Sequence, residues 1–413
     1  MLDRDPSSTR VATREPVPSP SRLLTLASRV PTWAAVLGIY AASRVFSTVL
    51  LFIVYRIAAS HPGQYADGYV DGGRGTGFFG FSNVWDGAYY TSIAQHGYPH
   101  VLPISASGAV EPNSWAFLPF FPWTVRILAQ ITGWDTGAVA AGVATIFGAL
   151  AALMLHRFLR LRVDALGALW GTTFFCFGAM AFVLQVGYAE SMFLFFCFTG
   201  MWALLTRRYV LLAWSGVIAS FTKPGALALA LALAIVVVHR LWTKDPFPRA
   251  ERIAAVVAGL AIAAAGFTWP LIAAAATGVP DAYLKTETAW WISYIGTDHF
   301  VPLTPWFLFA IRYLGILGAV VVLAIVALWF WGMRKPSLRR LGVDIRAFLT
   351  AYALYLFAVF LPQQSLPRLL MPLAPLVAVD SITHRKHLRH LVLGSGMALQ
   401  FVAIVTLWLT GPP

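Results

Sequence analysis

The sequence predicts an all-α, polytopic integral membrane protein, and three observations support that fold class. Of its 413 residues, 59% are hydrophobic and only 11% are charged, whereas soluble domains carry about 25% charged residues. Apolar runs long enough to cross the roughly 30 Å of bilayer hydrocarbon recur along the whole chain. The formal charge of +13 comes from basic residues that punctuate these runs, which is typical of topology signals and not of a nucleic-acid-binding face. We therefore expect no nucleic-acid partner.

The apolar runs predict about eleven transmembrane helices in a single domain over residues 32–413. Their expected positions in chain order are residues 32–58, 136–157, 165–184, 189–206, 209–221, 225–241, 253–276, 306–332, 346–361, 368–383 and 391–410. Ahead of them, residues 1–31 are rich in Ser, Pro and Arg and poor in apolar residues. Such a segment buries too little apolar surface to fold, so a disordered cytoplasmic tail is expected there.

The positions of Lys and Arg predict how the chain is oriented in the plasma membrane. Six basic clusters lie at residues 4–29, 157–162, 207–208, 240–252, 334–346 and 385–389. All six fall on one side if residues 117–132 do not cross the membrane, and Lys and Arg accumulate on the cytoplasmic side. The N-terminus is then cytoplasmic and the C-terminus external. Two prolines and Arg126 within residues 117–132 favour an interfacial or re-entrant helix.

A long first external loop, residues 59–135 with interfacial helices, is where chemistry is expected. It contains VWDGAYYTSIAQHGYP, in which Asp86 is followed by Tyr89, Tyr90, Gln95, His96 and Tyr98. Aromatic rings stack on the apolar faces of sugars, and hydroxyl and amide groups bond to sugar hydroxyls. At this surface Asp86 could accept the proton of an attacking sugar hydroxyl as a general base. The alternative, which is compatible with that role, is that Asp86 caps a helix beginning at Gly87.

No cofactor is assigned with certainty from the sequence. Cys176 and Cys197 lie inside apolar runs, so they are expected to be buried and to form neither a disulfide framework nor a thiolate metal site. Asp67 and Asp71, together with Asp86, offer oxygen atoms to a divalent cation, but without a fixed ligand spacing no metal ligand is assigned. The sequence contains no Walker loop and no dinucleotide fingerprint, which argues against a nucleotide-driven pump.

Five motifs in order along the chain resemble the PIG-V-like branch of the GT-C membrane glycosyltransferases, which includes the second mannosyltransferase of GPI-anchor synthesis. They are WDGAYYTSIAQHGYP, AFLPFFP, GYAES, FTKPGAL and LPRLLMPLAPL. The resemblance implies a GT-C-like fold with an extracytoplasmic active site and a polyprenyl-phosphate-linked sugar donor. It also implies that Asp86 is the catalytic aspartate and that transfer inverts the anomeric configuration. Mannose is the implied sugar, and a lipid-linked glycan, a lipoglycan or a glycoprotein is the expected acceptor.

The phosphate of such a donor needs cationic partners on the outer side. The candidates are Lys223 in FTKPG, Arg368 in SLPRLL, His96 and Arg312. Lys223 stands where the family usually has arginine, so it keeps the positive charge but loses the planar fork that binds a phosphate in bidentate fashion. The alternative for Lys223 and Arg368 is that they reach from helix ends to the interface with the membrane lipids.

Three further side chains have a structural and a functional interpretation. Arg44 lies midway along the first predicted helix and is expected to pair with a buried carboxylate such as Glu190. Glu190, in GYAES, either packs and caps a helix or contacts substrate. The tandem Trp290 and Trp291 either belong to an interfacial belt or shape a groove for the acceptor.

Two other classes of protein fit a many-helix membrane chain. A transporter or lipid flippase would use the intramembrane charges as a translocation path, but the related halves typical of transporters are not visible. A scaffold subunit would leave Asp86 without a task. An Asp86→Asn exchange separates these classes, because only a glycosyltransferase is expected to lose turnover while it still binds its donor.

Overall fold

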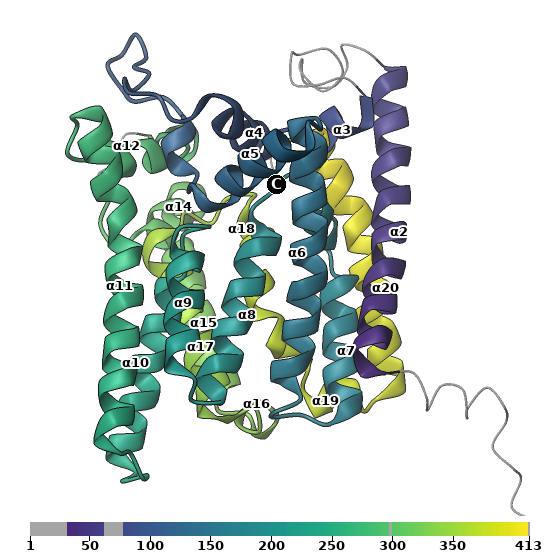
Figure 1. Ribbon diagram of the computed structural model, residues 1–413, viewed down its shortest axis with the longest axis vertical. Helices are drawn as coiled ribbons and strands as arrows, with labels where there is room; N and C mark the ends of the chain where they lie inside the picture. Colours follow the sequence, from purple (N-terminus) through teal and green to yellow (C-terminus); the bar gives the residue numbers. More distant parts are fainter. Residues whose placement is uncertain (1–30, 62–76, 297–299, 412–413) are drawn as a thin grey trace, which may run out of the picture.

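The computed structural model describes residues 31–61, 77–296 and 300–411. Its helices run roughly side by side through the molecule, with short helices gathered at the two ends (Figure 1). Across these described ranges there is no β-strand, and one isolated β-bridge joins Ile104 to Val110. The all-α, multi-pass prediction is confirmed.

Six helices are long and apolar enough to cross a membrane. They are α2 (Thr32–Ser60), α6 (Thr136–Leu159), α11 (Arg249–Thr277), α15 (Ile316–Met333), α17 (Gly342–Val359) and α20 (Lys386–Ile404), which continues into the π-helix η4 (Val405–Leu409). Four shorter apolar helices lie among them, namely α7 (Ala165–Cys176), α8 (Glu190–Leu205), α9 (Tyr209–Ser220) and α10 (Leu227–Trp242). At 16 residues, α8 and α10 are the longest of these four, and a helix of that length rises about 24 Å, less than the bilayer core.

Three predicted spans differ from the structure. Residues 165–184 form α7, which ends at Cys176, and a separate 3₁₀-helix, η2 (Ala181–Gln185). Residues 306–332 form two helices, α14 (Pro305–Leu314) and α15, separated by Gly315 at a φ of +58°. Residues 368–383 form no continuous helix but the pieces α18 (Leu366–Leu369), the 3₁₀-helix η3 (Met371–Val377) and α19 (Asp380–Thr383). The prolines of this apolar segment lack the N–H group that an α-helix needs, which breaks it. The count of eleven spans therefore stays a prediction.

The broken segment nevertheless runs through the interior of the molecule. It connects α18, in the upper half of Figure 1, to α19 at the lower face, and η3 packs against α7, α8 and α17. Irregular backbone is tolerated at membrane depth where protein surrounds it. This path brings Arg368 into the same half of the molecule as the first external loop.

Short helices cover the upper face of the bundle in Figure 1. They are α3 (Gly77–Phe81), α4 (Asp86–His96), η1 (Ser114–Ala116), α5 (Phe120–Thr132), α12 (Ala282–Ala289) and α13 (Ile292–Ile295). The amphipathic helix α5, from the segment predicted to be interfacial, packs against α4 and α6. At the lower face lie α16 (Pro336–Arg339), α19 and the turn between α10 and α11. These elements carry or adjoin three of the basic clusters.

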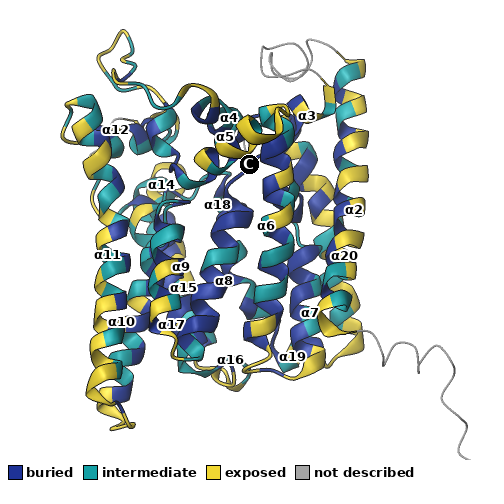
Figure 2. Cartoon of the chain, in the orientation of Figure 1, coloured by how far each residue is buried: buried dark blue, intermediate teal, exposed yellow. Residues whose placement is uncertain are grey.

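The most deeply buried helix is α8, which packs against α6 and α9 and is dark blue along most of its length in Figure 2. At the periphery, α15 is strongly apolar but only 17% buried, as expected of a helix that faces lipid. Both cysteines are buried and free, as predicted. The helix α8 begins at Glu190 in the upper half of the molecule, and the candidate site is built around that end.

Candidate functional site

The segment that the sequence predicts to be the first external loop is fixed to the start of α8 by two residues of the GYAES motif. Gly187 allows this approach, because a side chain there would overlap Oδ1 of Asn83. The hydroxyl oxygen of Tyr188 accepts a hydrogen bond of 3.2 Å from the backbone N–H of Asp86. The motif therefore holds Asp86 in a defined position above Glu190.

The residue before Asp86 has an unusual backbone conformation. Trp85 has a φ of +56°, a region that costs a non-glycine residue of the order of 1–3 kcal/mol and that occurs often at functional sites. The indole of Trp85 donates to the carbonyl of Trp408 in η4 at 3.0 Å, which links this turn to the last helix. Asp86 is the first residue of α4 and Trp85 is its N-cap, so Asp86 does not occupy the N-cap position that one interpretation of the sequence gave it.

Four charged side chains of opposite sign form what we call the charge network: Asp86, Glu190, Lys223 and Arg368. Nη1 of Arg368 lies 2.5 Å from Oδ2 of Asp86 and 3.2 Å from Oε1 of Glu190. Nζ of Lys223 lies 2.7 Å from the same Oε1 atom. The side chains are 17% exposed for Asp86, 3% for Glu190, 10% for Lys223 and 8% for Arg368. Arg368 contacts both acids, so removing it would leave the largely buried Asp86 carboxylate without its cation, which is strongly unfavourable.

Arg44 is structural, as predicted, but not through Glu190. Its guanidinium donates to the backbone carbonyl of Ala181 at 2.6 Å and to that of Cys176 at 3.1 Å. Cys176 is the last residue of α7, so Arg44 satisfies carbonyl groups that the helix end leaves without an intrahelical partner. The predicted pairing of Arg44 with Glu190 was wrong, because Glu190 pairs with Lys223 and Arg368 instead.

A cavity of about 580 Å³ opens beside the charge network. Its polar and aromatic lining includes Asp86, Tyr90, Lys223, Tyr283, Glu287, Trp290, Trp291, Tyr355, Gln363, Gln364, Ser365 and Arg368. Its apolar lining includes Leu227, Phe267, Pro270 and Leu284. This volume is within the range of ligand-binding pockets. Six predicted site or groove residues from distant parts of the chain meet here, namely Asp86, Tyr90, Lys223, Trp290, Trp291 and Arg368.

Other predicted site residues lie elsewhere. Tyr89 stacks on Phe117 with ring centroids 4.6 Å apart, and the Tyr98 hydroxyl donates to the Phe117 carbonyl at 2.7 Å. Gln95 and His96 are exposed at the far end of α4, about 15 Å from Asp86 at the rise of an α-helix. Arg312 is exposed on α14. None of them lines the cavity. Asp67 and Asp71 lie outside the described residues.

Glu287 in α12 is among the residues of the cavity wall that received no role from the sequence. Burial raises the pKa of its carboxyl to about 7, although the Tyr283 hydroxyl and Lys223 act in the opposite direction. The sequence did contain a signal, because Tyr283, Glu287 and Trp290 follow one another at spacings of four and three residues and so share one helix face. A second cavity of about 490 Å³ adjoins the first, sharing Thr288 and Trp291 with it.

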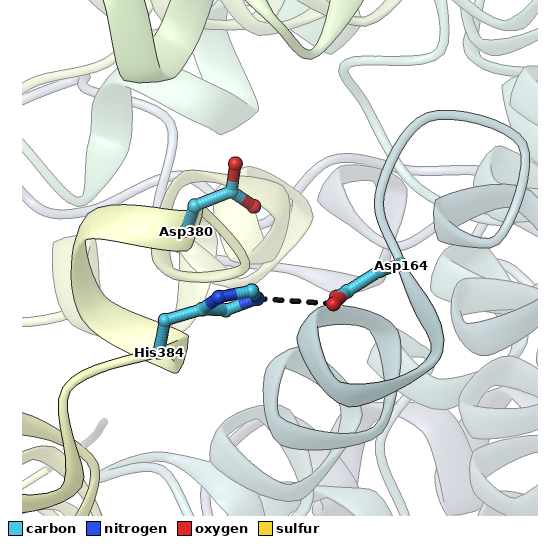
Figure 3. Close-up of side chains that lie close together, drawn as sticks. All are labelled: Asp164, Asp380 and His384. Carbon is cyan, nitrogen blue, oxygen red and sulfur yellow. Dashed lines mark hydrogen bonds and ion pairs between the residues drawn. The ribbon is translucent and has the colours of Figure 1, made fainter. Parts of the chain in front are cut away.

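Two groups of side chains in the structure include carboxylates that could bind a metal ion. Asp164, Asp380 and His384 form a cluster (Figure 3). Asp380 is in α19, at the lower face of Figure 1. Each of the three residues has a protein partner: Asp164 caps α7 through the Gly167 N–H at 2.7 Å and contacts His384 at 3.0 Å, and Asp380 pairs with Arg340 at 2.9 Å. Around Asp86, the two nearby cations make a poor environment for a divalent ion. Neither group is assigned as a metal site.

The comparisons with known proteins give one family and several distant structures. Residues 65–244 match the family described as mannosyltransferase (PIG-V). This region contains four of the five sequence motifs, while the motif with Arg368 and the helix with Glu287 lie beyond it. No curated protein matches the chain.

Three solved structures share a distant similarity with the chain. The oligosaccharyltransferase of Archaeoglobus fulgidus, in complex with Zn and sulfate, has a TM-score of 0.47 at 13% identity, covering 91% of this chain and 53% of that one. ArnT from Cupriavidus metallidurans, bound to undecaprenyl phosphate, has a TM-score of 0.42 at 14% identity, covering 87% and 62%. AglB from Archaeoglobus fulgidus, with an inhibitory peptide and a dolichol-phosphate, has a TM-score of 0.45 at 12% identity, covering 92% and 56%.

The chain thus spans between half and two thirds of the length of these proteins. The family match agrees with the resemblance noted in the sequence: residues 65–244, with Asp86, Glu190 and Lys223 among them, match the PIG-V mannosyltransferase family.

Proposed function

We propose that the protein is a membrane glycosyltransferase that moves a sugar, mannose by its family resemblance, from a polyprenyl-phosphate sugar to a lipid-linked glycan, lipoglycan or glycoprotein acceptor on the extracytoplasmic side. The observation that supports this most directly is the cavity wall on which the Asp86 carboxylate adjoins two buried cations, Lys223 and Arg368. A carboxylate suits the attacking hydroxyl, and the cations suit the phosphate leaving group. The apolar wall formed by Leu227, Phe267 and Pro270 suits the polyprenyl chain.

The two cations have the task of binding the donor phosphate and stabilising the charge that develops on it. Arg368 presents a planar fork to the phosphate oxygens, and Lys223 adds a point charge. Glu190 holds both cations through one buried oxygen atom. Cations fixed in advance in a water-poor site stabilise a developing negative charge more than mobile ones do, because they need not reorganise during the reaction.

Asp86 has the task of accepting a proton from the acceptor. In the structure, Arg368 occupies its Oδ2 atom at 2.5 Å. A donor phosphate competes for the same guanidinium, so donor binding frees the carboxylate. The acceptor O–H bond then breaks and its proton passes to Asp86. The acceptor oxygen bonds to C1 of the sugar as the bond from C1 to the phosphate oxygen breaks, and that electron pair stays on the phosphate.

The experiment that tests this function uses purified full-length protein with a panel of polyprenyl-phosphate sugars and a membrane lipid extract. Products are identified by mass spectrometry. The wild-type protein is expected to form a glycosylated lipid or glycan. Asp86→Asn is expected to lower turnover by about 10²- to 10⁴-fold, the contribution of a general base, while donor binding is retained.

The matched control is Glu111→Gln, the same kind of exchange at an exposed acid of the same loop that does not line the cavity. It is expected to transfer sugar like the wild type. Native turnover by Asp86→Asn would refute the proposal. Movement of a lipid across the membrane without any glycosylated product would instead identify a flippase.

A further inference from the structure

A second carboxyl group faces the cavity from α12, and the mechanism above gives it no task. Tyr283, Glu287 and Trp290 all line the cavity, because their spacing places them on one side of the helix. Glu287 is half-buried, and it faces the cavity. Within the described ranges no cation pairs with it, whereas Asp86 and Glu190 both belong to the charge network.

The surroundings of Glu287 favour its protonated form near neutral pH. The titratable and charged groups that act on it are Tyr283 on its own helix, Lys223 in the turn before α10, Asp86 on α4 and Tyr355 on α17. Burial is the largest influence and Asp86 adds to it, which together raise the pKa of Glu287 to about 7. A protonated carboxyl donates one hydrogen bond and still accepts others, and it does not repel a neighbouring phosphate.

The position of Glu287 relative to the cations decides what it can contact. In a polyprenyl-phosphate sugar, the sugar is attached directly to the phosphate. A phosphate held by Lys223 and Arg368 therefore places the sugar against the other groups that surround these cations within the cavity. Glu287 is one of them, and Trp290 next to it supplies an aromatic ring, which suits the apolar face of a sugar.

We propose that Glu287 hydrogen-bonds to hydroxyl groups of the transferred sugar and so helps to determine which sugar donor the enzyme accepts. This inference rests on the proposed function, which it deepens. Tyr283 orients the carboxyl, and Asp86 remains the proton acceptor.

The experiment compares the wild type, Glu287→Ala and Glu287→Gln with polyprenyl-phosphate mannose and with analogues that each lack one sugar hydroxyl. Glu287→Ala is expected to lower kcat/KM for the parent donor by about 10- to 100-fold, as for a lost buried hydrogen bond. Glu287→Gln is expected to keep most of the activity, because an amide also donates and accepts. Asp281→Asn is the control on the same helix, since Asp281 is exposed and pairs with Lys285 at the surface.

The coupling between variant and donor is the decisive result. With the wild type, the donor that lacks the contacted hydroxyl is expected to react more slowly than the parent donor. With Glu287→Ala, the two donors are expected to react equally fast, because the variant has already lost the contact to that hydroxyl. If every deoxy donor loses the same factor in both proteins, Glu287 does not contact the sugar. Inactivity of Glu287→Gln in a protein with wild-type thermal stability would make Glu287 a proton acceptor and overturn the inference.

Failure of the underlying function gives a different result. If the wild type transfers no sugar from any donor, the proposed function itself is wrong, and the inference falls with it. If the wild type is active and Glu287→Ala matches it with all donors, the inference alone is wrong. Tyr283→Phe, which keeps the ring but removes the orienting hydroxyl, is expected to give a smaller loss than Glu287→Ala and provides a second variant should the alanine protein misfold.

Discussion

Glu190 shows how individual residues of this site depend on one another. Its Oε1 atom contacts both Lys223 and Arg368, so one buried acid positions two cations that reach it from the turn before α10 and from α18. A buried ion pair adds little to stability compared with a well-packed apolar pair, because desolvation of the charges opposes their attraction. The network is therefore better explained by its function at the cavity than by stability.

At the same scale, Glu287 makes stability depend on pH. Its pKa is raised from 4.5 to about 7 in the folded protein, so the folded state binds this proton more tightly than the unfolded chain. Stability is then lost as the pH rises from about 4.5 through 7, up to about 3 kcal/mol from this group. We expect the melting temperature of Glu287→Gln to exceed that of the wild type at pH 8 and to approach it at pH 5. Parallel curves for the two proteins in thermal denaturation between these pH values would contradict this assignment.

The sequence predicted some residues of the site and missed others for a physical reason. Asp86, Lys223 and Arg368 were found because an ionisable group near the membrane is costly and stands out in an apolar sequence. Glu287 was one acid among several in an external segment, and only the folding of α12 over the cavity distinguishes it. His96 was placed with Asp86 because they are close in sequence, but the length of α4 separates them.

At the scale of the elements, the last helix supports the first external loop. Trp408 in η4 is fully buried, its ring packs 5.3 Å from that of Tyr188, and its indole donates to the Phe81 carbonyl at 3.1 Å. Tyr188 in turn accepts a hydrogen bond from the Asp86 backbone. The C-terminal element therefore helps to position Asp86 although it lies more than three hundred residues away in the sequence.

A variant of Trp408 tests this support. Trp408→Ala leaves a cavity beside Tyr188 and is expected to destabilise the protein by about 3–5 kcal/mol and to lower kcat more than it raises KM. Trp408→Phe, which refills part of the space, should restore much of both. Trp214→Ala, at a ring that is 65% exposed on α9, is the matched control. Denaturation and transfer assays measure these effects, and unchanged kcat in Trp408→Ala would show that η4 does not support the site.

Among the elements, the sequence predicted the long helices well and the broken ones poorly. Hydropathy identifies a segment that avoids water but not the number of pieces into which it folds. Residues 368–383 are as apolar as a span, and their prolines divide them into short turns. In residues 306–332, a single Gly315 separates two helices. Both breaks depend on how neighbouring helices enclose the irregular backbone, which a single sequence does not reveal.

At the scale of the whole molecule, the basic clusters within the described residues lie at the end opposite to the candidate site. The predicted orientation places the site outside the cytoplasm, and labelling of single engineered cysteines tests it. Ser107→Cys, in the exposed loop near the site, is expected to react with a membrane-impermeant reagent on intact cells. Asp245→Cys, in the turn between α10 and α11, is expected to react only after lysis. The reverse pattern would show that the orientation is the opposite of the predicted one. The native cysteines are buried, so they are expected to contribute little background labelling.

The charge network, with two acids and two cations, affects the release of the lipid carrier at the end of a catalytic cycle. A donor lipid brings a phosphodiester with one negative charge, but the lipid left after sugar transfer is a monoester that approaches two. In the proposed reaction, Lys223 and Arg368 are therefore expected to attract the spent lipid more strongly than the fresh donor. Departure of the lipid carrier, and not bond making, would then limit the turnover rate, and added polyprenyl phosphate would inhibit in competition with the donor, more strongly as its second proton is lost.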